Sequence, residues 1–248
     1  MSPIANQTSR PTGQTLTVPG RFEGPPGMGN GGYSCGTFAR LVEGPAEVSL
    51  RRPVPLDRPL SSLEAADGPV EIRDEDHLIA EVRPAGPLDG IEPPVRPTVE
   101  QATRYSEASP FRGEAHLFPG CFVCGHEHPD GLHLYAGAVE GRDGLGAGVL
   151  RPSASLPSTR GALDPEIVWA ALDCPSFTPD RMLAGEPHML GRLSVELLAP
   201  VPDDGPSVVV GWELGSKGRK LDSACALLSP EGDLLARSRA VWIALAGD

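Results

Sequence analysis

The chain carries one strand pattern twice, and this repeat limits the folds open to it. Apolar Val48 and Leu50 alternate with polar Ser49 and Arg51, and the chain then breaks at Pro53-Val54-Pro55. The same alternation occupies 193–197, and the chain then breaks at Pro200-Val201-Pro202. A period of two predicts half-buried antiparallel strands. We interpret the repetition as an internal duplication, with each Pro-Val-Pro marking the same strand exit.

Other segments repeat in the same order. “VEIRDEDHLIAEVR” (70–83) and “ALLSPEGDLLARSR” (226–239) each predict a strand, an acidic turn and a second strand. A helix is expected over 30–41, where Asn30 can cap its start. A second helix is expected over 164–173, which begins with the cap-and-proline pair Asp-Pro. One helix against a run of antiparallel strands, twice over, predicts an α+β fold.

Proline separates the two halves. Residues 84–97 carry prolines at 84, 87, 93, 94 and 97, a density that excludes both a helix and a sheet ladder. The segment 98–109 can form one short helix, capped by Thr98 with Gln101 in the third position.

These features divide the chain into four parts. We predict a disordered tail over 1–14, an N-terminal half over 15–83, a linker with a short helix over 84–112, and a C-terminal half over 113–248.

Composition excludes several classes of partner. A net charge of −12 over 248 residues repels phosphate backbones, so no nucleic-acid partner is expected. The sequence has no charged-then-apolar leader and no long apolar run, so neither secretion nor a membrane partner is expected. The 5 cysteines are scattered along the chain and indicate reduced thiols in the cytoplasm.

The stretch “GMGNGGYSCG” (27–36) fits two familiar motifs. As G-x-G-x-x-G it suggests a dinucleotide loop, and as G-x-S-x-G it suggests a nucleophile at Ser34. Both motifs need a strand that leads directly into the glycines, and Pro25-Pro26 cannot extend such a strand. A serine esterase that uses Ser34, with Asp173 and His188 later in the chain, stays as an alternative.

A third interpretation uses the glycines as backbone donors. Asn30-Gly31-Gly32 begins the first predicted helix, whose first N–H groups lack intrahelical partners and carry the positive end of the helix dipole. Glycines allow a substrate carbonyl to approach these groups closely. The arrangement predicts an oxyanion site that needs a base or a nucleophile from elsewhere.

Three segments together resemble a known family. “FPGCFVCGHEHPDGLHL” (118–134), “DPEIVWAALDCPS” (164–176) and “GRKLDSACALLSPEGDLLARSRAVWIAL” (218–245) are similar to hotdog-fold acyl-CoA thioesterases of the phenylacetic-acid-degradation type. The resemblance implies a long antiparallel sheet wrapped around a helix, and the two halves then imply a double hotdog. It also implies active sites between two units, with a helix N-terminus from one unit and an acid from the other.

The family pattern assigns residues to these roles. Where the family has its catalytic acid, the first half has Ala39 and the second half has Asp173. The resemblance therefore implies one composite catalytic site, in which Asn30, Gly31 and Gly32 face Asp173. The other combination, Ala39 with 164–166, should be inactive.

We expect the Gly31 and Gly32 amides to hold the thioester carbonyl, while Asp173 attacks it or activates a water. Ser176 or Thr178 could hold that water, and Arg219 with Lys220 could bind CoA phosphates. CoA is then part of the substrate, and no separate cofactor is expected. Two chains could also pair as a homodimer.

Two further interpretations concern metals and catalysis. Cys121, Cys124, His126 and His128 invite a zinc interpretation, and the Cys-x-x-Cys pair is half of a usual structural site. The second pair of such a site normally lies a dozen or more residues away, whereas all four residues here lie within eight, so no metal is expected. The divided motif, with the glycines in one half and the acid in the other, also fits a non-catalytic acyl-CoA-binding protein.

Overall fold

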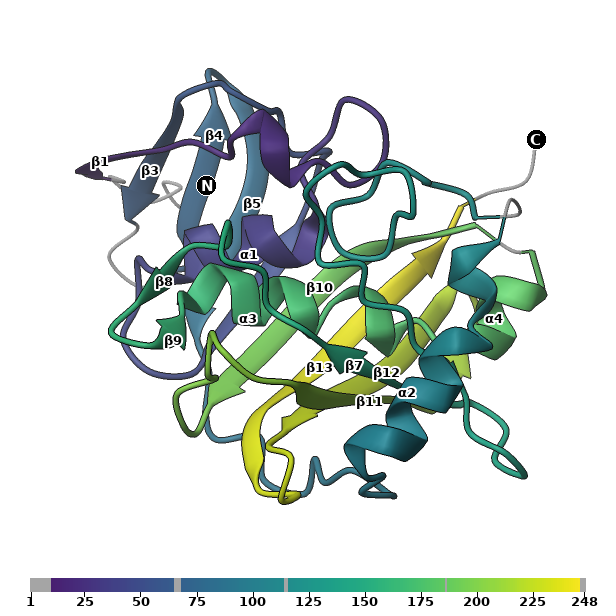
Figure 1. The fold of residues 1–248 in the computed structure, drawn as a ribbon. Helices are drawn as coiled ribbons and strands as arrows, with labels where there is room; N and C mark the ends of the chain where they lie inside the picture. The colour runs from purple at the N-terminus through teal and green to yellow at the C-terminus, as the bar shows by residue number, and fades with distance from the viewer. Residues whose placement is uncertain (1–9, 65–67, 114–115, 186, 246–248) are drawn as a thin grey trace.

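The computed structural model describes residues 10–64, 68–113, 116–185 and 187–245 (Figure 1). Within these residues, 11 strands form one antiparallel sheet in the order β1-β3-β4-β5-β2-β10-β13-β12-β11-β7-β6. The strands are β1 (Arg10–Leu16), β2 (Ala46–Leu50), β3 (Leu60–Glu64), β4 (Val70–Asp74), β5 (His77–Pro84), β6 (Gly137–Ala138), β7 (Leu145–Leu150), β10 (His188–Leu197), β11 (Ser207–Lys217), β12 (Lys220–Leu228) and β13 (Leu234–Ala244). A separate small ladder joins β8 (Ser158–Thr159) to β9 (Ala162–Leu163).

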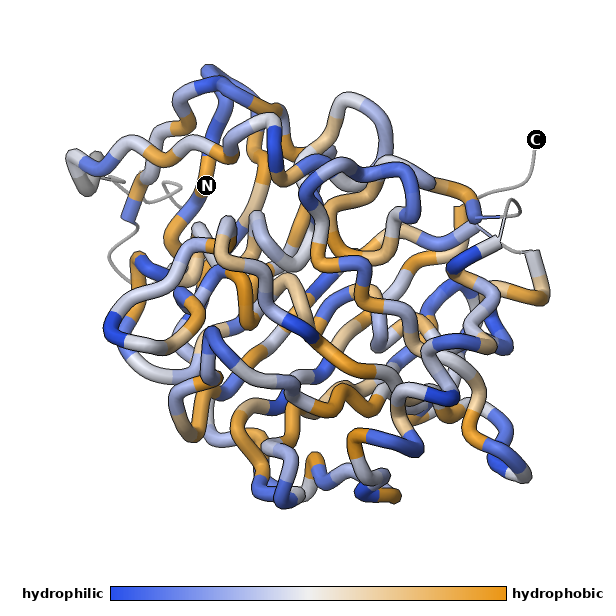
Figure 2. The backbone as a smooth tube through the Cα atoms, in the orientation of Figure 1, coloured by the Kyte–Doolittle hydropathy of each residue, from blue (hydrophilic) through white to orange (hydrophobic). Residues whose placement is uncertain are grey.

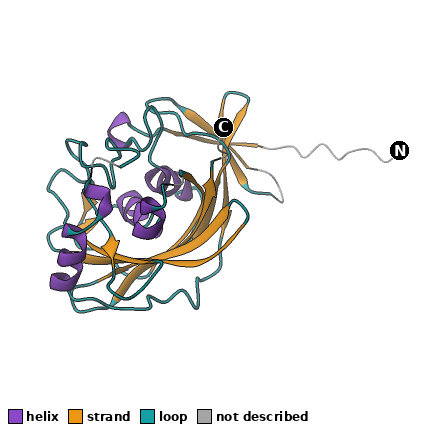
Figure 3. Ribbon diagram, turned by 90° about the vertical axis from the view of Figure 1, so that its right-hand side faces the viewer, coloured by secondary structure: helices purple, strands orange, loops and turns teal. Residues whose placement is uncertain are grey.

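The helices lie on both faces of this sheet. The sheet curves around α1 (Gly31–Ala39) and α3 (Pro165–Ala171), which pack against each other (Figure 3). The remaining described helices are α2 (Val99–Glu107), α4 (Pro179–Leu183) and the 3-10 turns η1 (Gly20–Phe22), η2 (Pro110–Arg112) and η3 (Cys174–Ser176). The expected helices at 30–41, 98–109 and 164–173 are thus confirmed with slightly shorter bounds.

Hydropathy follows this arrangement. Hydrophobic residues follow the strands that face α1 and α3, whereas hydrophilic residues gather at the tip of the β4–β5 hairpin and in the outer loops (Figure 2). The main core lies between the sheet and the two helices, and its largest fully buried side chains include Phe38, Leu60, Ile72, Ile167 and Leu193. Burial of such side chains drives the sheet to close over the helices.

Two glycines of α1 allow the helices to touch. A Cβ atom added at Gly32 would lie 2.7 Å from the carbonyl oxygen of Trp169 and 2.5 Å from the Cβ of Asp173. A Cβ added at Gly36 would lie 2.8 Å from the Cα of Glu166. Backbone atoms cannot rotate away from such contacts, so these positions accept only glycine in this arrangement. Part of the glycine cluster therefore sets the distance between two helices.

Strands β2 and β10 join the two halves of the sheet. Glu47 lies opposite Ser194, and the flanking pairs are Ala46–Val195 and Val48–Leu193. Glu47 and Ser194 lie 147 residues apart, as do the two Pro-Val-Pro segments, so each is the counterpart of the other in the repeat and the ladder is symmetric about this pair. The two segments whose alternation repeats in the sequence meet at this seam.

Matching hydrogen bonds hold the start of α1 and the start of α3. Gly29, directly before the first cap, donates its N–H to the carbonyl of Val54 at 2.9 Å. Leu163, directly before the second cap, donates to the carbonyl of Val201, also at 2.9 Å. Val54 and Val201 are the central residues of the two Pro-Val-Pro segments, and each is 2% exposed. Both segments therefore anchor a helix N-terminus in addition to ending a strand.

The Pro-rich segment is bound to the sheet along its length. Arg237 on β13 is buried and donates from Nε to Glu196 on β10 at 2.7 Å. Its other guanidinium nitrogens pair with Asp89 at 3.2 Å and Glu92 at 3.3 Å. We call residues 85–97 the strap, because they cross the outer face of the sheet and are held there by Arg237.

Helix α2 follows the strap and covers a second, smaller core. The predicted capping box is present: Thr98 accepts from the Gln101 N–H, and the Gln101 side chain accepts from the Thr98 N–H. Ala102 of α2 is fully buried over the outer face of the sheet. The neighbouring core residues on that face include Val149, Val208, Val210, Ala224 and Ala226.

The expected tail needs one correction. Residues 10–14 belong to β1, which pairs with β3, while residues 1–9 lie outside the described part of the chain. The pairing has an irregular register between Pro11 and Thr15, so the side-chain pattern lacks the alternation on which the sequence analysis relied. Backbone hydrogen bonds to β3 define this strand.

Candidate functional site

The N-terminus of α1 forms one wall of the site. Asn30 is 2% exposed, and its Oδ1 accepts the N–H of Tyr33 at 2.9 Å, as an N-cap does. The Gly31 N–H occupies the first helical position and meets no acceptor in the part of the chain that the structure describes. An unpaired donor at a helix N-terminus favours a negatively charged partner.

Asp173 supplies that negative charge from the other half of the chain. It follows α3 directly, at a position where the backbone turns away from helical geometry into η3. Its Oδ2 accepts the Gly32 N–H at 2.7 Å and the Asn30 amide at 3.3 Å. Asp173 lies at the C-terminal end of its own helix, but its carboxylate faces the N-terminus of α1, which explains how an acid is tolerated here.

The environment of Asp173 is unusual for a carboxylate. The residue is 2% exposed, and its Oδ1 has no hydrogen-bond partner among the described residues. Burial raises the pKa of Asp173 to about 7, although the hydrogen bonds from Gly32 and Asn30 favour the ionised form. A carboxylate that is buried, perturbed and only half satisfied is typical of functional sites.

A cavity of about 380 Å³ reaches this carboxylate. Asn30, Gly31 and Asp173 lie on its wall. Most of the remaining wall is apolar and includes Met28, Val54, Phe111, Phe118, Phe177, Met182, Leu190, Trp242 and Ile243. The size and the apolar lining are typical of small-molecule sites with a few polar groups for orientation.

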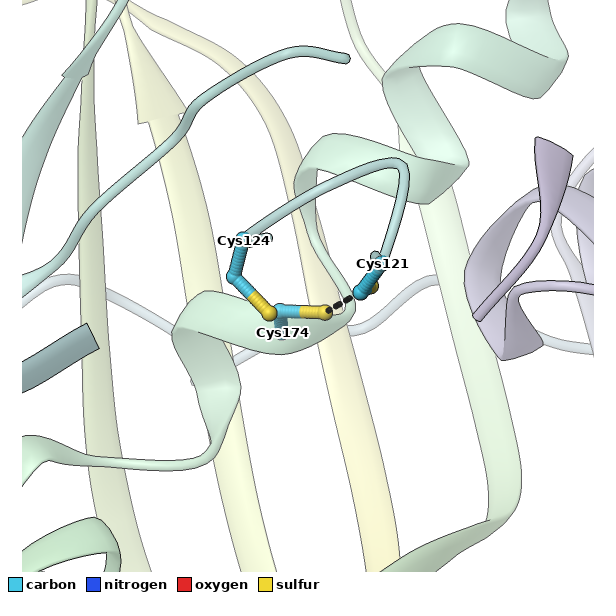
Figure 4. A group of neighbouring side chains, drawn as sticks. All are labelled: Cys121, Cys124 and Cys174. Carbon is cyan, nitrogen blue, oxygen red and sulfur yellow. Dashed lines mark hydrogen bonds between the residues drawn. The ribbon is translucent and has the colours of Figure 1, made fainter. Parts of the chain in front are cut away.

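Three cysteines lie beside Asp173 on the same cavity wall. The Sγ atoms of Cys121, Cys124 and Cys174 lie within 4.8 Å of one another, and Figure 4 shows the three side chains pointing together. Hydrogen bonds from the other two thiols hold the pKa of Cys121 well below its usual range. His116 Nε2 lies 3.3 Å from the Sγ of Cys124.

The cysteine cluster differs from the set considered in the sequence analysis. His128 Nε2 contacts the backbone oxygen of Arg21 at 2.8 Å, and His126 lies near Glu127. Neither histidine joins the thiols. Cys174 and His116 take part instead, and local spacing gives no signal for either, because they lie far along the chain or outside the Cys-x-x-Cys loop.

Two residues proposed to hold a water are used elsewhere. Ser176 is fully buried, donates to the backbone oxygen of Asp173 at 2.7 Å and accepts from the indole N–H of Trp242 at 2.9 Å. Thr178 is also fully buried and donates to Glu213 at 3.0 Å. Ser176 therefore fixes the backbone around Asp173, and Thr178 fixes the start of α4.

The predicted phosphate-binding residues lie outside the cavity. Arg219 and Lys220 sit at the exposed tip of the β11–β12 hairpin, where Arg219 Nε donates to the Ala244 carbonyl at 2.8 Å. Two other cations, Arg51 and Arg52, line the cavity and were missed. Arg51 pairs with Glu81, whereas Arg52 is exposed and forms no ion pair with a described residue.

Ser34 is placed poorly for a nucleophile. It lies inside α1, is fully buried, and its Oγ has no hydrogen-bond partner among the described residues. It does not line the cavity. His188, the base that the esterase alternative needs, does line the cavity, so the two residues do not form a pair there.

The other predicted combination, Ala39 with residues 164–166, does not form a site like that of Asn30, Gly31 and Asp173. Ala39 ends α1, and Glu166 at the start of α3 accepts from Arg40 at 3.0 Å. The carboxylate of Glu166 is therefore paired with a neighbouring cation, and the start of α3 has Pro165 where α1 has a glycine amide.

None of the described helices is both long and apolar enough to cross a bilayer.

Comparison with known proteins identifies the fold. No protein-family model matches the sequence. No curated protein matches it either. Solved structures do match over nearly the whole chain. A thioesterase II candidate from Thermobifida fusca superposes with a TM-score of 0.61 at 15% identity, and covers 97% of this chain and 96% of its own.

Two further structures agree. A conserved protein with a hotdog fold from Alicyclobacillus acidocaldarius has a TM-score of 0.52 at 12% identity, with 98% of this chain and 97% of its own covered. Acyl-CoA thioesterase II TesB2 from Mycobacterium marinum has a TM-score of 0.52 at 10% identity, with 86% of each chain covered. At these identities the comparisons establish a shared fold, so the hotdog prediction is confirmed.

Proposed function

We propose that the protein hydrolyses an acyl-CoA thioester at one site, formed by the N-terminus of α1 and Asp173. The observation that carries the proposal is the carboxylate of Asp173, 2.7 Å from the Gly32 N–H and on the wall of an apolar cavity. The thioesterase names of structures with the same fold support the reaction class.

We also infer that the chain is a double hotdog, with one unit in each half. The symmetric register at Glu47–Ser194 supports this inference, as do the matching hydrogen bonds from Gly29 and Leu163 to the two Pro-Val-Pro segments. On this view the active site is composite, because α1 belongs to the first unit and Asp173 to the second.

The Gly31 amide is the proposed donor to the thioester carbonyl. The sequence predicts this role for Gly31 and Gly32 together, but the Gly32 N–H already donates to Asp173. Gly31 lines the cavity, and its N–H at the positive end of α1 has no acceptor among the described residues. A preorganised donor of this kind stabilises the oxyanion that develops on the carbonyl oxygen.

Asp173 then promotes hydrolysis by one of two routes. In the first, a carboxylate oxygen bonds to the carbonyl carbon, the carbon–sulfur bond breaks, the CoA thiolate leaves, and water hydrolyses the resulting anhydride. In the second, Asp173 takes a proton from a water whose oxygen bonds to the carbonyl carbon, the carbon–sulfur bond then breaks, and CoA leaves as a thiol that carries this proton. Oδ1, which has no partner among the described residues, is the oxygen available for either route.

The remaining contacts define the substrate class. The apolar wall suits an acyl chain, which gains by leaving water. Arg52, exposed at the cavity and without an ion pair to a described residue, is the proposed contact for a CoA phosphate. Arg219 and Lys220 stay as predicted contacts only for a CoA that extends past the end of β13, where Arg219 meets Ala244.

Thiol release from a panel of short, medium, long and aryl acyl-CoAs tests the function. We expect release by the unaltered protein and by Ser34→Ala, and a loss of at least 100-fold in Asp173→Asn. Glu166→Gln is the matched control, because it neutralises a carboxylate at the start of α3, outside the cavity. Binding of acyl-CoA without any release would reject hydrolysis, and a loss confined to Ser34→Ala would favour the esterase.

Repeated turnover in ¹⁸O water separates the two routes. Direct attack, followed by addition of water to the Asp173 carbonyl of the anhydride, places the label in the carboxylate of Asp173, whereas water activation leaves that carboxylate unlabelled. A cytoplasmic location, a homodimer and the absence of nucleic-acid and membrane partners remain predictions from the sequence.

A further inference from the structure

The three cysteines beside Asp173 have the spacing of metal ligands. Tetrahedral zinc with zinc–sulfur bonds of about 2.3 Å separates its sulfur ligands by about 3.8 Å. Here the Sγ atoms of Cys121 and Cys174 lie 3.9 Å apart, and all three Sγ atoms lie within 4.8 Å of one another. The thiols therefore approach coordination geometry before any ion is present.

The loop that carries two of the thiols is shaped to bring them together. The Gly125 N–H donates to the Cys121 carbonyl at 2.8 Å and closes a tight turn around the Cys-x-x-Cys sequence. A Cβ at Gly125 would lie 2.3 Å from the carbonyl oxygen of Pro119 and 2.4 Å from the amide nitrogen of Cys121. Only glycine fits this turn. The turn and η3 direct their sulfur atoms to one point (Figure 4).

Each sulfur atom also meets an N–H donor. The side-chain amide of Asn30 lies 3.7 Å from the Sγ of Cys121 and 3.9 Å from the Sγ of Cys174. His116 Nε2 lies 3.3 Å from the Sγ of Cys124. N–H donors of this kind support sulfur ligands that are bound to a metal. Neutral thiols buried as small apolar groups need no such donors.

His116 supports the cluster without being one of its ligands. Its Nδ1 accepts the Phe118 N–H at 2.9 Å, so the proton of the neutral ring lies on Nε2. The Nε2–H group therefore donates to Cys124 and has no lone pair for a metal ion. The cluster thus offers three protein ligands, all on the wall of the cavity.

We propose that Cys121, Cys124 and Cys174 bind one Zn²⁺ ion as thiolates, with a fourth ligand taken from the cavity. Sulfur-rich tetrahedral sets select zinc among the common divalent ions. Binding releases the protons of those thiols that are still protonated. The ion ties the Cys-x-x-Cys loop to η3, and so holds the residue after Asp173 in place.

This proposal does not depend on the proposed hydrolysis, and its test measures metal alone. The full chain is purified with zinc, and bound metal is counted by elemental analysis. We expect one zinc per chain and, in X-ray absorption, three sulfur neighbours at about 2.3 Å. Two or fewer sulfur neighbours would overturn the assignment. Metal-free protein with a mass two hydrogens below that of the fully reduced chain would also overturn it, because two of the three thiols would then form a disulfide.

Cysteine variants localise the ion. Cys121→Ala, Cys124→Ala and Cys174→Ala should each weaken zinc binding by at least 100-fold. Cys35→Ala and Cys225→Ala are matched controls, because both residues are fully buried free cysteines outside the cluster. His116→Ala should weaken binding by about 10- to 100-fold, as supporting residues do. Circular dichroism identifies any variant that fails to fold. In that case, the zinc affinity of the unaltered protein is measured by competition with a chromogenic chelator. An affinity no higher than that of a surface site overturns the proposal.

Discussion

Gly36→Ala tests whether close contact between α1 and α3 builds the site. Gly36 touches neither the cavity nor Asp173, so the variant removes none of the proposed catalytic groups. The new Cβ would lie 2.8 Å from both the Cα of Glu166 and the Cβ of Trp169. Ordinary contact begins at 3.4 Å, so the helices must separate by about 0.6 Å.

The energy follows from two opposing effects. Alanine is favoured over glycine inside a helix by about 1 kcal/mol. Overpacking a core costs about 1–3 kcal/mol, and the upper part of that range applies because Glu166 is met at its backbone. The expected net destabilisation is about 1–2 kcal/mol, or a melting temperature lower by about 2–8 °C for a chain of this size.

The same displacement moves Asp173 relative to Gly31 and Gly32. A shift approaching 1 Å at reacting groups can reduce a rate by about 100-fold, so we expect thiol release to fall by about tenfold or more. Thermal unfolding and the acyl-CoA assay measure the two effects. Gly86→Ala is the control, because no atom lies within 4 Å of its added Cβ, and its stability should change by less than about 0.5 kcal/mol. A Gly36→Ala protein at least as stable as the original would refute the reasoning.

Three further predictions concern the cap, the cavity mouth and the strap. Asn30→Ala should lower the free energy of unfolding by about 1 kcal/mol through loss of the N-cap, measured by chemical denaturation, and should also slow thiol release, because Asn30 contacts Asp173. Arg52→Ala should raise the KM for acyl-CoA with little change in kcat, and should leave the KM for a phosphate-free thioester unchanged. Burial alone would raise the pKa of Glu196, but the hydrogen bonds from Arg237 and the Leu88 N–H lower it. The lowered pKa adds stability above about pH 4.3, and this stability is lost as the pH falls through the folded-state pKa. Glu196→Gln should therefore be less stable than the original protein by about 1–3 kcal/mol at pH 7, and the difference should shrink in acid-denaturation measurements below about pH 4.

Local patterns in the sequence predict the elements well. The caps at Asn30 and Thr98, the alternation in β2 and β10, and the two strand–turn–strand segments all match the structure. Each of these signals lies within a few residues of the element that it predicts. The irregular strand β1 carries no such signal, so the sequence places its residues 10–14 in the predicted tail.

The candidate site depends more on contacts that sequence order does not reveal. Asp173 was found because a family spacing points to it, and its contact with Gly32 then follows from the crossing of α1 and α3. Cys174 joins a loop far away in sequence, so no spacing rule finds it. For Ser176 the sequence suggests a contact that the structure does not show. A hydroxyl close to Asp173 in sequence is a reasonable group to hold a water, but the Ser176 hydroxyl accepts a hydrogen bond from the indole of Trp242.

The ladder between β2 and β10 joins segments of a single polypeptide. A seam between separate subunits would come apart on dilution, whereas here each side is held at a fixed local concentration by the strap. Identical subunits must also carry every substitution twice. Within one chain, Pro165 and Glu166 could replace the donors of one helix while Gly31 and Gly32 were kept in the other.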